Sequence, residues 1–388
     1  MSTETNKGVL NDYAFYVNEH ITVSSLDENH YFSTENMLPN RGGVCRATSL
    51  PEQEKVVRVE AGDILISNIR PYFKKIWLAK ELAGCSNDVL CIRAKSMCLP
   101  EFLFYYLSSD IFFDYVMTGA KGTKMPRGDK QQILHFHMLI PSLDIQKQVI
   151  SILSCIDKKI QLNAQINQNL EQQAQAIFKS WFVDFEPFQD GRFVDSELGP
   201  IPEGWRVGTM GDVIELHDSK RVPLSGSKRE KMRKNYPYYG AASLMDYVEN
   251  YLFDGIYTLL GEDGTVVTDT GMPVLQYVWG KFWVNNHAHI LTGKIGHSPE
   301  TLYILLSNTP VKSIVTGAVQ PKISQANLKS IPIVIAPREQ ILKYKELIDP
   351  LFAKVRENHD ESNRLFILRD TLLPKLMSGE IDVSEVEI

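Results

Sequence analysis

The sequence has few cysteines, and none of them is placed for a disulfide framework or a metal site. Five occur, at positions 45, 85, 91, 98 and 155, and no two form a Cys-x-x-Cys pair. An odd and unclustered set is typical of reduced thiols in a cytoplasm, and it argues against disulfides and structural zinc. We therefore expect a cytoplasmic protein without a zinc site.

Long apolar runs are also missing. No apolar stretch approaches the roughly 20 residues that a membrane-spanning helix needs. The first residues, MSTETNKGVLNDYAF, lack the basic segment followed by an apolar stretch that marks a secretory signal. The sequence therefore predicts neither a membrane span nor a secretory signal.

Motifs of the common enzyme classes are absent as well. The nearest Gly-Lys cluster, GAKGTKMPRGDK, lacks the GxxxxGK[ST] spacing that lets backbone amides hold phosphates, which argues against a motor ATPase site. There is no Asn-Pro-Pro-aromatic stretch of the kind that amino-methyltransferases use to hold a flipped base, and no Gly-rich strand-to-helix turn suits S-adenosylmethionine. The run Glu52-Gln53-Glu54-Lys55 faintly resembles a nuclease motif, but such charge runs are usually solvated surface. We expect no catalytic residue in this chain.

Two pairs of histidines raise the question of a metal ion. His135 and His137 are two residues apart, as are His287 and His289, so each pair could share one face of a strand and ligate a metal. No Cys, Asp or Glu accompanies them at ligand spacing. We therefore expect no metal site and no cofactor bound by this chain.

What the sequence does contain is enough apolar residues for more than one folded core. Its 388 residues are 44% hydrophobic and 23% charged, which is typical of a globular protein with two or more domains. The net charge of −6 at first disfavours a nucleic-acid partner, but DNA responds to local patches of charge. Between His217 and Tyr238, seven basic residues stand against two acidic ones. The charges are segregated along the chain.

The most informative feature is an internal repeat with a period near 195 residues. The segment 144–182 aligns without a gap on the segment 339–377, so that apolar residues fall on apolar residues and Asn163 falls on Asn358. Other matched pairs are Leu153 with Ile348 and Phe178 with Leu373. The chain thus alternates between a variable block and a repeated segment.

The repeat continues upstream with a small slip in the alignment. Pro100-Glu101 resembles Pro299-Glu300, and Thr118-Gly119-Ala120 resembles Thr316-Gly317-Ala318. In this alignment Lys124 falls near Lys322. A polar loop that carries a lysine therefore recurs in both variable blocks.

Both repeated segments have the periodicity of a long helix with one apolar stripe. The stripe comprises residues 149, 152, 156, 160, 166, 170, 177 and 181 in the first segment, and 341, 344, 348, 351, 355, 365, 372 and 376 in the second. Pro350 and Pro374 should bend the second helix or remove hydrogen bonds locally. A helix of about 38 residues is about 57 Å long and needs a partner. The other copy can supply it in a coiled-coil-like pair; alternatively, each helix packs on its own domain. The two asparagines either fix the register of the pair or are solvated.

The variable blocks have the pattern of mixed α and β structure. Short β-branched or aromatic runs, such as ILISNIRPYFKKIWLA, SNDVLCIRA, TLLGEDGTVVTDT and KFWVNNHAHILTG, are broken by turn residues and predict strands. We expect one helix near EFLFYYLSSDIFFDYVM and another near TLYILLSNTPVKSIV. The stretch from Pro187 to Gly204 is the clearest linker.

Basic residues that lie beside turns and tyrosines are the candidate contacts to DNA. Lysine and arginine neutralise phosphates, and polar or aromatic neighbours are needed to read bases. The alternative is that these segments are solvated, flexible loops. The candidates are Arg70, Lys74, Lys75, Lys121, Lys124, Arg127, Lys220, Arg221, Lys228, Arg229, Lys231, Arg233, Lys234, Tyr238, Tyr239, Gln320 and Lys322.

Taken together, these features resemble the specificity subunits of type I restriction–modification systems. The resemblance covers essentially the whole chain. It is strongest in IPSLDIQKQVISILSCIDKKIQLNAQINQNLEQQAQAIFKSWFVDFEPF and in its C-terminal counterpart, PREQILKYKELIDPLFAKVRENHDESNRLFILRDTLLPKLMSGEI. The passages LGPIPEGWRVGTMGDV and YPYYGAASLMDYVENYLFDGIYTLLGEDGTV are also similar to the family. One departure is that no counterpart of IPEGW precedes the first strands.

With the repeat, this resemblance predicts an α+β fold with a pseudo-two-fold internal repeat. Two mixed α/β target-recognition domains, residues 1–143 and 185–336, would be separated by two long antiparallel, coiled-coil-like helices. Those helices would occupy residues 144–184, the central conserved region, and 337–388, which includes a tail.

The resemblance also implies partners for the chain. Each domain would read one half of a split sequence in double-stranded DNA, and the helices would set the spacer and dock two methyltransferase subunits. Motor–nuclease subunits would complete the restriction form. S-adenosylmethionine, ATP and Mg would be bound by those partner subunits, because this chain must leave the everted base and its methylation to them.

Two alternatives belong to other classes of function. A helical scaffold protein that binds other proteins and not DNA would show no salt-dependent binding to a duplex, even with a methyltransferase added. A self-contained nuclease or methylase would show activity when the purified chain is mixed with cofactor and DNA. The missing motifs argue against the second alternative.

Overall fold

A computed structural model of the protein describes residues 6–317 and 319–383. The chain forms two compact units, of which unit 1 comprises Met1–Gln161 and Ser362–Ile388 and unit 2 comprises Leu162–Glu361. The unit boundary falls within both long helices, so each unit contains part of each of them. No helix among the described residues is both long enough and apolar enough to span a membrane. All five cysteines are free thiols.

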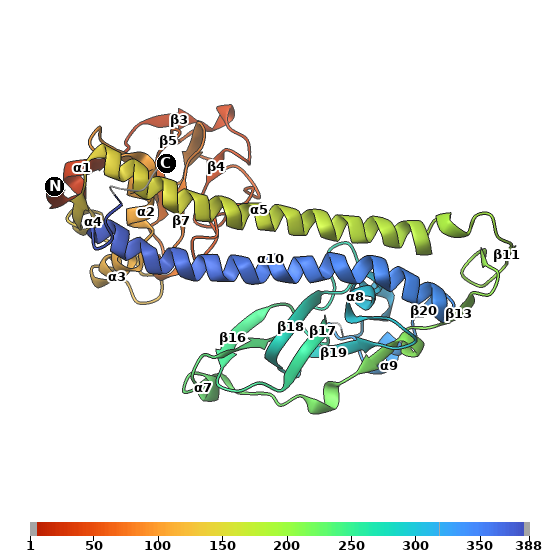
Figure 1. Cartoon of the computed structure of the whole chain (residues 1–388). Helices are drawn as coiled ribbons and strands as arrows, with labels where there is room; N and C mark the ends of the chain where they lie inside the picture. The colour runs from red at the N-terminus through yellow and green to blue at the C-terminus, as the bar shows by residue number, and fades with distance from the viewer. Residues whose placement is uncertain (1–5, 318, 384–388) are drawn as a thin grey trace. The chain divides into compact units, whose positions relative to one another are not determined.

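The two long helices predicted from the repeat are present. Helix α5 spans Leu143–Phe182 and helix α10 spans Arg338–Ser378 (Figure 1). Their interiors contain no glycine and many straight-chain residues that favour helix. Helix α10 is continuous through Pro350 and Pro374, the two positions at which we expected a local disturbance.

Within unit 2 the two helices pair in antiparallel fashion. The Asn163 side chain donates to the carbonyl of Asn358 at 3.3 Å and to the carboxylate of Glu361 at 2.8 Å. The Asn358 amide donates to the side-chain oxygen of Asn167 at 2.8 Å. Asn163 and Asn358 are both buried. The matched asparagines therefore lie inside the seam, and the solvated alternative was wrong.

Within unit 1 the helices pair and also pack on the adjacent block. Arg369 of α10 lies 2.9 Å from Asp157 of α5, and Asp157 also accepts a hydrogen bond from Tyr105 at 2.8 Å. Leu153 and Leu373 belong to the same hydrophobic cluster as the core of the block. Pairing and packing on the domain were stated as alternatives, and the structure shows both.

The buried line on α5 differs in part from the predicted stripe. Val149 is buried as expected, but the line then passes through Leu153, Asn163, Ala174 and Phe178. A count of apolar residues alone misses small and polar residues that face the partner helix. On α10, five of the eight predicted positions are buried.

Unit 1 is built on two four-stranded sheets, whose strand orders are β2-β9-β6-β7 and β3-β5-β8-β4. The strands of the first are β2 (Ala14–Tyr16), β9 (Val89–Ala94), β6 (Ile64–Ser67) and β7 (Ile76–Leu78). Those of the second are β3 (His20–Thr22), β5 (Lys55–Val59), β8 (Ala83–Cys85) and β4 (Tyr31–Phe32). A separate pair joins β1 (Asn6–Val9) to β10 (His137–Ile140), and the short helices are α1 (Leu10–Tyr13), α2 (Pro100–Leu107), α3 (Asp110–Thr118) and α4 (Lys130–Leu134).

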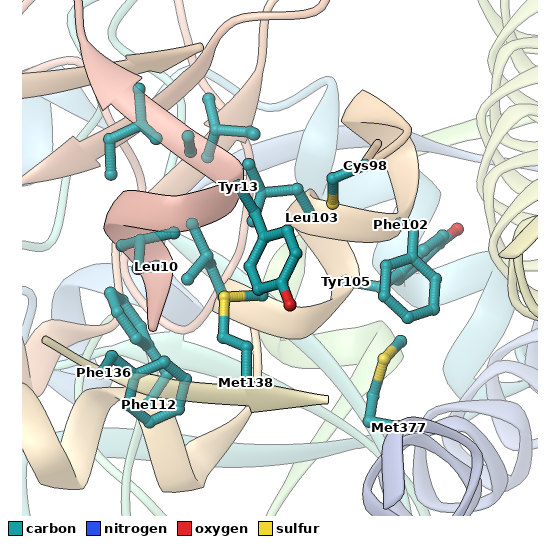
Figure 2. Packing of buried hydrophobic residues seen from close by; sticks show 14 of the residues in the cluster. Leu10, Tyr13, Cys98, Phe102, Leu103, Tyr105, Phe112, Phe136, Met138 and Met377 are labelled. Atoms are coloured by element: carbon teal, nitrogen blue, oxygen red, sulfur yellow. The ribbon is translucent and has the colours of Figure 1, made fainter. Parts of the chain in front are cut away.

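The largest core cluster of unit 1 collects apolar side chains from the β2-β9-β6-β7 sheet, the short helices and both long helices. Figure 2 shows Met377 of α10 pointing into the cluster that contains Phe102 and Tyr105 of α2. Phe112 and Phe136 pack edge to face, with ring centroids 5.1 Å apart. The end of the long helix is thus part of the hydrophobic core that supports the first variable block.

Unit 2 is built on a six-stranded sheet with the order β14-β19-β17-β18-β15-β16. Its strands are β14 (Ile214–Leu216), β19 (Ala288–Gly293), β17 (Phe253–Gly261), β18 (Leu275–Val284), β15 (Tyr236–Tyr239) and β16 (Leu244–Val248). The other elements are β11 (Phe193–Val194), β12 (Ile201–Pro202), β13 (Arg206–Thr209), β20 (Pro332–Ile335), α6 (Met210–Val213), α7 (Gly226–Arg229), α8 (Pro299–Ser307) and α9 (Gln325–Lys329). Strand β13 pairs with β20, and β11 with β12.

The internal repeat extends from the helices into both blocks. Antiparallel pairing of β1 with β10 in unit 1 corresponds to that of β13 with β20 in unit 2. Asp12 accepts a hydrogen bond from the Val9 amide at 2.8 Å, and Asp212 accepts one from the Thr209 amide at 2.9 Å. Because these strands and turns match, the internal repeat of the α+β fold is confirmed. A counterpart of IPEGW would precede β1, at residues outside the described ranges.

Three local predictions need correction in their extent. The helix expected across residues 101–117 is two helices, because the Ser109 side chain accepts from the Phe112 amide and starts α3 afresh. The helix expected from residue 301 ends at Ser307, shortly before Pro310, which cannot continue it. The stretch predicted as a linker contains the paired strands β11 and β12 and leads into the buried Trp205.

Candidate nucleic-acid interface

In unit 1 the two basic segments picked out in the sequence lie against each other. Ile69 forms an antiparallel bridge with Arg127. The amide of Arg70 donates to the carbonyl of Pro126 at 2.8 Å. Lys121 forms a further bridge with Arg127, which closes the second segment into a loop. Tertiary structure therefore gathers the six basic candidates of the first block on two adjoining loops, which we name the 69–75 loop and the 121–127 loop.

On the 69–75 loop the lysines are held by protein acceptors. Lys74 lies 2.7 Å from the Asp110 carboxylate, and Lys75 donates to the carbonyl of Thr34 at 2.6 Å. Hydrogen bonds from Lys74 and Arg41 outweigh the effect of burial, so that the pKa of Asp110 lies below its usual value. These lysines are only partly exposed, and their contacts order the loop.

On the 121–127 loop the charged groups are more accessible. Lys121 lies 2.8 Å from Asp129 and Arg127 lies 3.1 Å from Asp88, and both cations are exposed to solvent. Lys124 is exposed as well. Exposed ion pairs are worth little because water and salt screen them, so a phosphate can replace the carboxylate at small cost.

The same arrangement of loops recurs in unit 2. Its contacts are bridges of Asp263 and of Thr316 with Lys322, and a hydrogen bond of 2.9 Å from the Gly264 amide to the Pro321 carbonyl. Lys322 therefore occupies the position of Arg127, at an offset of 195 residues. The alignment that placed Lys124 near Lys322 was wrong.

The slip in the upstream alignment is corrected by the same contacts. Gly122 and Gly317 hold corresponding places in the two loops, with φ of 99° and 87°. Both angles lie in the region that favours glycine, which explains why each loop has one there. Thr316 therefore corresponds to position 121 and not to Thr118. Ala318 lies outside the described residues.

Several candidates between residues 217 and 239 support the fold of unit 2. Arg229 lies 2.8 Å from Asp246 and 4.9 Å from the centre of the Tyr238 ring. Tyr238 is only 2% exposed, and the Tyr239 ring packs on Phe282. Proposing Tyr238 as a DNA contact was therefore wrong in this conformation, because its ring is inside the core.

The remaining candidates of unit 2, apart from Arg221, are on the surface. Lys234 is exposed although it lies 2.8 Å from Asp246. The other exposed candidates are Lys220, Lys228, Lys231, Arg233, Gln320 and Lys322. These side chains can reach a ligand without a change in the fold.

Arg221 belongs to a buried network of charges. Its guanidinium lies 2.6 Å from Glu262 and 3.4 Å from Asp218, and it also donates to the carbonyl of Ala288 at 2.8 Å. Asp218 is further held by the His289 ring at 2.6 Å. Burial raises the pKa of Asp218, but the hydrogen bond and charge of His289 outweigh it, and the pKa lies below its usual value. Arg221 therefore supports the fold of unit 2, and its assignment as a DNA contact stays a prediction.

The geometry of this network bears on a metal ion, because possible ligand atoms of Asp218, Glu262 and His289 lie within 4.8 Å of one another. One ring nitrogen of His289 faces Asp218 and the other lies 2.8 Å from the carbonyl of Ile323, which can only accept. Lys322 adds a further cation, 3.2 Å from Glu262. Protein groups thus balance the carboxylates and occupy the ring nitrogens. Through Glu262 and His289, the cluster connects Lys322 to the six-stranded sheet.

Sequence reasoning missed one basic residue that the structure brings to the loops of unit 1. The Arg41 guanidinium bonds to Asp110 and to the carbonyl of Ser108, and its amide donates to the carbonyl of Lys74 at 3.0 Å. The run Pro-Asn-Arg-Gly-Gly indicates a turn there. No sequence signal places that turn beside the 69–75 loop.

Comparison with known proteins gives the family. The sequence matches the type I restriction modification DNA specificity domain over residues 31–172 and 202–360. The chain belongs to this family. Similar relatives include the MjaIX specificity subunit of Methanocaldococcus jannaschii, 26% identical over 84% of this chain and 79% of the relative. The HindI specificity subunit of Haemophilus influenzae is 24% identical over 90% of this chain and 94% of the relative.

A solved structure agrees at the level of the fold. The crystal structure of a type I restriction–modification S subunit from M. genitalium superposes with a TM-score of 0.55 at 14% identity, covering 97% of this chain and 96% of that one. The chain is therefore a type I specificity subunit, and its role is sequence-specific recognition of DNA. The scaffold alternative, in which it binds no DNA, is excluded.

Proposed function

We propose that each unit of this specificity subunit reads one half of a split DNA target, and that the chain carries no active site. The observation that carries the proposal is the recurrence of the two-loop arrangement. Arg127 in unit 1 and Lys322 in unit 2 are both exposed and hold the same place in the same fold. Other loop residues differ between the units, so two similar supports present unlike surfaces, as an asymmetric target requires.

Partner subunits would supply the chemistry. We propose that two methyltransferase subunits dock on this chain and that motor–nuclease subunits join them in the cytoplasm to form the restriction complex. S-adenosylmethionine, ATP and Mg would be bound by those subunits. The absence of phosphate-binding and methyltransferase motifs from the sequence supports this division of work.

An exchange of domains tests the assignment of the half-sites. Residues 1–143, which end where α5 begins, would be replaced by the equivalent block of another family member, and methylated positions would be sequenced in a host that carries the complete system. One half of the methylated sequence should change and the other should stay. The converse exchange of residues 185–336 is the matched control, and it should change only the second half. If either exchange alters both halves or neither, the proposal is wrong.

The paired helices are proposed to set the distance between the half-sites. Because Asn163 bonds to the Asn358 carbonyl across the seam, an insertion has to be made in both helices to keep them paired. Four residues added beside each asparagine lengthen the pair by about 6 Å, or about two base pairs. The spacer of the methylated sequence should grow accordingly. An unchanged spacer in an assembled, active complex would exclude the helices as its determinant.

A further inference from the structure

A strained and rigid turn lies at the centre of the basic loops in unit 1. Among residues 6–317 and 319–383, six non-glycine residues have a positive φ, and four of them lie together here. They are Asn40, Arg41, Arg70 and Lys74, with φ between 50° and 61°. Such conformations cost free energy and persist only where the surroundings enforce them. Their concentration in two facing turns indicates that these turns have a functional role.

The surroundings of this turn fix it from three sides. The Asn40 amide donates to the carbonyl of Phe73 at 2.7 Å, and the Arg41 amide to that of Lys74 at 3.0 Å. Asp110, at the start of α3, binds the side chains of both Arg41 and Lys74. On the other side, the Arg70 amide is bound to the 121–127 loop. The backbone of residues 70–74 is therefore held before any ligand arrives.

This fixed turn presents two aromatic rings to solvent. Tyr72 is 46% exposed and Phe73 is 37% exposed, and their ring centroids lie 4.7 Å apart. Lys75 lies 5.9 Å from the centre of the Phe73 ring, and the cations of the 121–127 loop adjoin the same turn. We name Tyr72 and Phe73 the aromatic tip. Exposed rings with a basic surround fit a ligand that has flat apolar faces and negative charges, which describes a nucleic acid.

The corresponding described residues of unit 2 form no such tip. The residues that correspond to the 69–75 loop begin at Asp263-Gly264, as the shared bridge and hydrogen bond show. The sequence that follows, Thr265-Val266-Val267-Thr268, contains no aromatic residue. Whatever the tip does is therefore confined to the first of the two units.

We propose that the aromatic tip inserts at a base step of the half-site read by unit 1 and unstacks it. The inference rests on the proposed function of that unit. Side chains that wedge between bases have to be rigid, because the energy of unstacking is repaid only if little conformational entropy is lost on binding. The pinned turn meets this requirement. A step that unstacks easily would then be favoured at a position where the tip forms no hydrogen bond to a base edge.

The test uses the chain in complex with its methyltransferase subunits and a duplex that carries the methylated sequence. The probe is 2-aminopurine, placed in turn at each position of the first half-site except the methylated base, which a methyltransferase everts by itself. The wild-type complex should raise the fluorescence several-fold at one step. The double variant Tyr72→Ala/Phe73→Ala should abolish that increase and weaken binding by about tenfold. Tyr72→Trp/Phe73→Trp should retain both.

Phe15→Ala is the matched control, since Phe15 is a 42% exposed aromatic residue of unit 1 outside the basic loops. It should leave the fluorescence and the affinity unchanged. If the alanine variant unstacks the same step and binds as tightly as the wild type, the proposal is wrong. It is equally wrong if the variant folds but no longer co-purifies with the methyltransferase, because the tip then contacts protein. Failure of the wild-type complex to bind its duplex would instead overturn the proposed function.

Discussion

The two units hold their corresponding pairs of loops by different contacts. In unit 1 the loops are held mainly through backbone hydrogen bonds between turns, and the turn between Arg70 and Lys74 presents exposed aromatic rings. In unit 2 a buried network around Asp218 and Glu262 holds the loop that carries Lys322. A repeated scaffold thus tolerates unlike loops, and this freedom allows a duplicated fold to read an asymmetric sequence. It also makes the two units sensitive to different substitutions.

The largest difference between the units should follow from Asp218→Ala. This change removes one of the two carboxylates that Arg221 and His289 share, and removal of one partner from a buried ion pair costs about 3–5 kcal/mol. We expect unit 2 of the variant to unfold at a lower denaturant concentration than unit 2 of the wild type. Hydrogen exchange, followed separately in each unit, measures this difference. Lys121→Ala is the control in unit 1 and should have little effect, because water and salt screen its exposed ion pair. If both variants lose the same amount of stability, the two units do not differ in how they hold these loops.

The matched helix positions should respond alike. Leu153 and Ile348 are fully buried, one in each unit, so Leu153→Ala and Ile348→Ala should each cost about 2–5 kcal/mol by leaving a cavity. Chemical denaturation of the purified variants measures this loss. Leu162→Ala, at an exposed position of α5, is the matched control and should cost far less. A large loss of stability at only one of the two buried positions would show that the matched residues are not packed alike.

The units should also differ in their response to acid. Burial lowers the pKa of His297 in unit 2 to about 4, while the unfolded chain titrates near 6.5. Between these values the unfolded state binds a proton that the native state does not, so stability falls as the pH falls, by roughly 2–3 kcal/mol over the window. His297→Gln should flatten this dependence in urea titrations at pH 4.5, 5.5 and 7.

A histidine of unit 1 provides a control of opposite sign. A hydrogen bond to Asp27 raises the pKa of His30, so its contribution is present at low pH and is lost as the pH rises through that pKa. His30→Gln should therefore remove a small stabilisation on the acid side. If both variants shift stability in the same direction, the assignment of the two environments is wrong.

The smallest effect is expected at the corresponding cations of the two loops. Under the proposed function, Arg127→Ala and Lys322→Ala should each weaken binding of DNA several-fold, about 1 kcal/mol, and reduce the slope of log K against log salt by about 1. Binding to one duplex at four salt concentrations measures both quantities. Lys147→Ala, on α5, should leave the slope unchanged. A change in sequence preference at either loop position would show that the side chain reads a base.

Much of the fold follows from the sequence. Helical periodicity depends on residues that are close together in the chain, and the repeat is found by aligning the chain with itself. The gapless match of residues 144–182 with 339–377 predicted the two long helices, whereas the burial of Asn163 and Asn358 in the seam was left open until the structure showed it. Short β-branched runs identified the mixed α and β blocks. The points at which a predicted helix is interrupted were harder to predict. The break before α3, for example, depends on a single hydrogen bond, from the Phe112 amide to the Ser109 side chain.

The candidate site depended on tertiary structure. Arg221 and Lys220 are adjacent cations in the sequence, yet one is bound to buried carboxylates and the other is exposed. Likewise, the turn at residues 40 and 41 meets Phe73 and Lys74 only because the chain folds back. Local pattern determines which element a residue joins. Which charges are buried, and which loops adjoin, is decided by partners far away in the sequence, and only the folded chain brings them together.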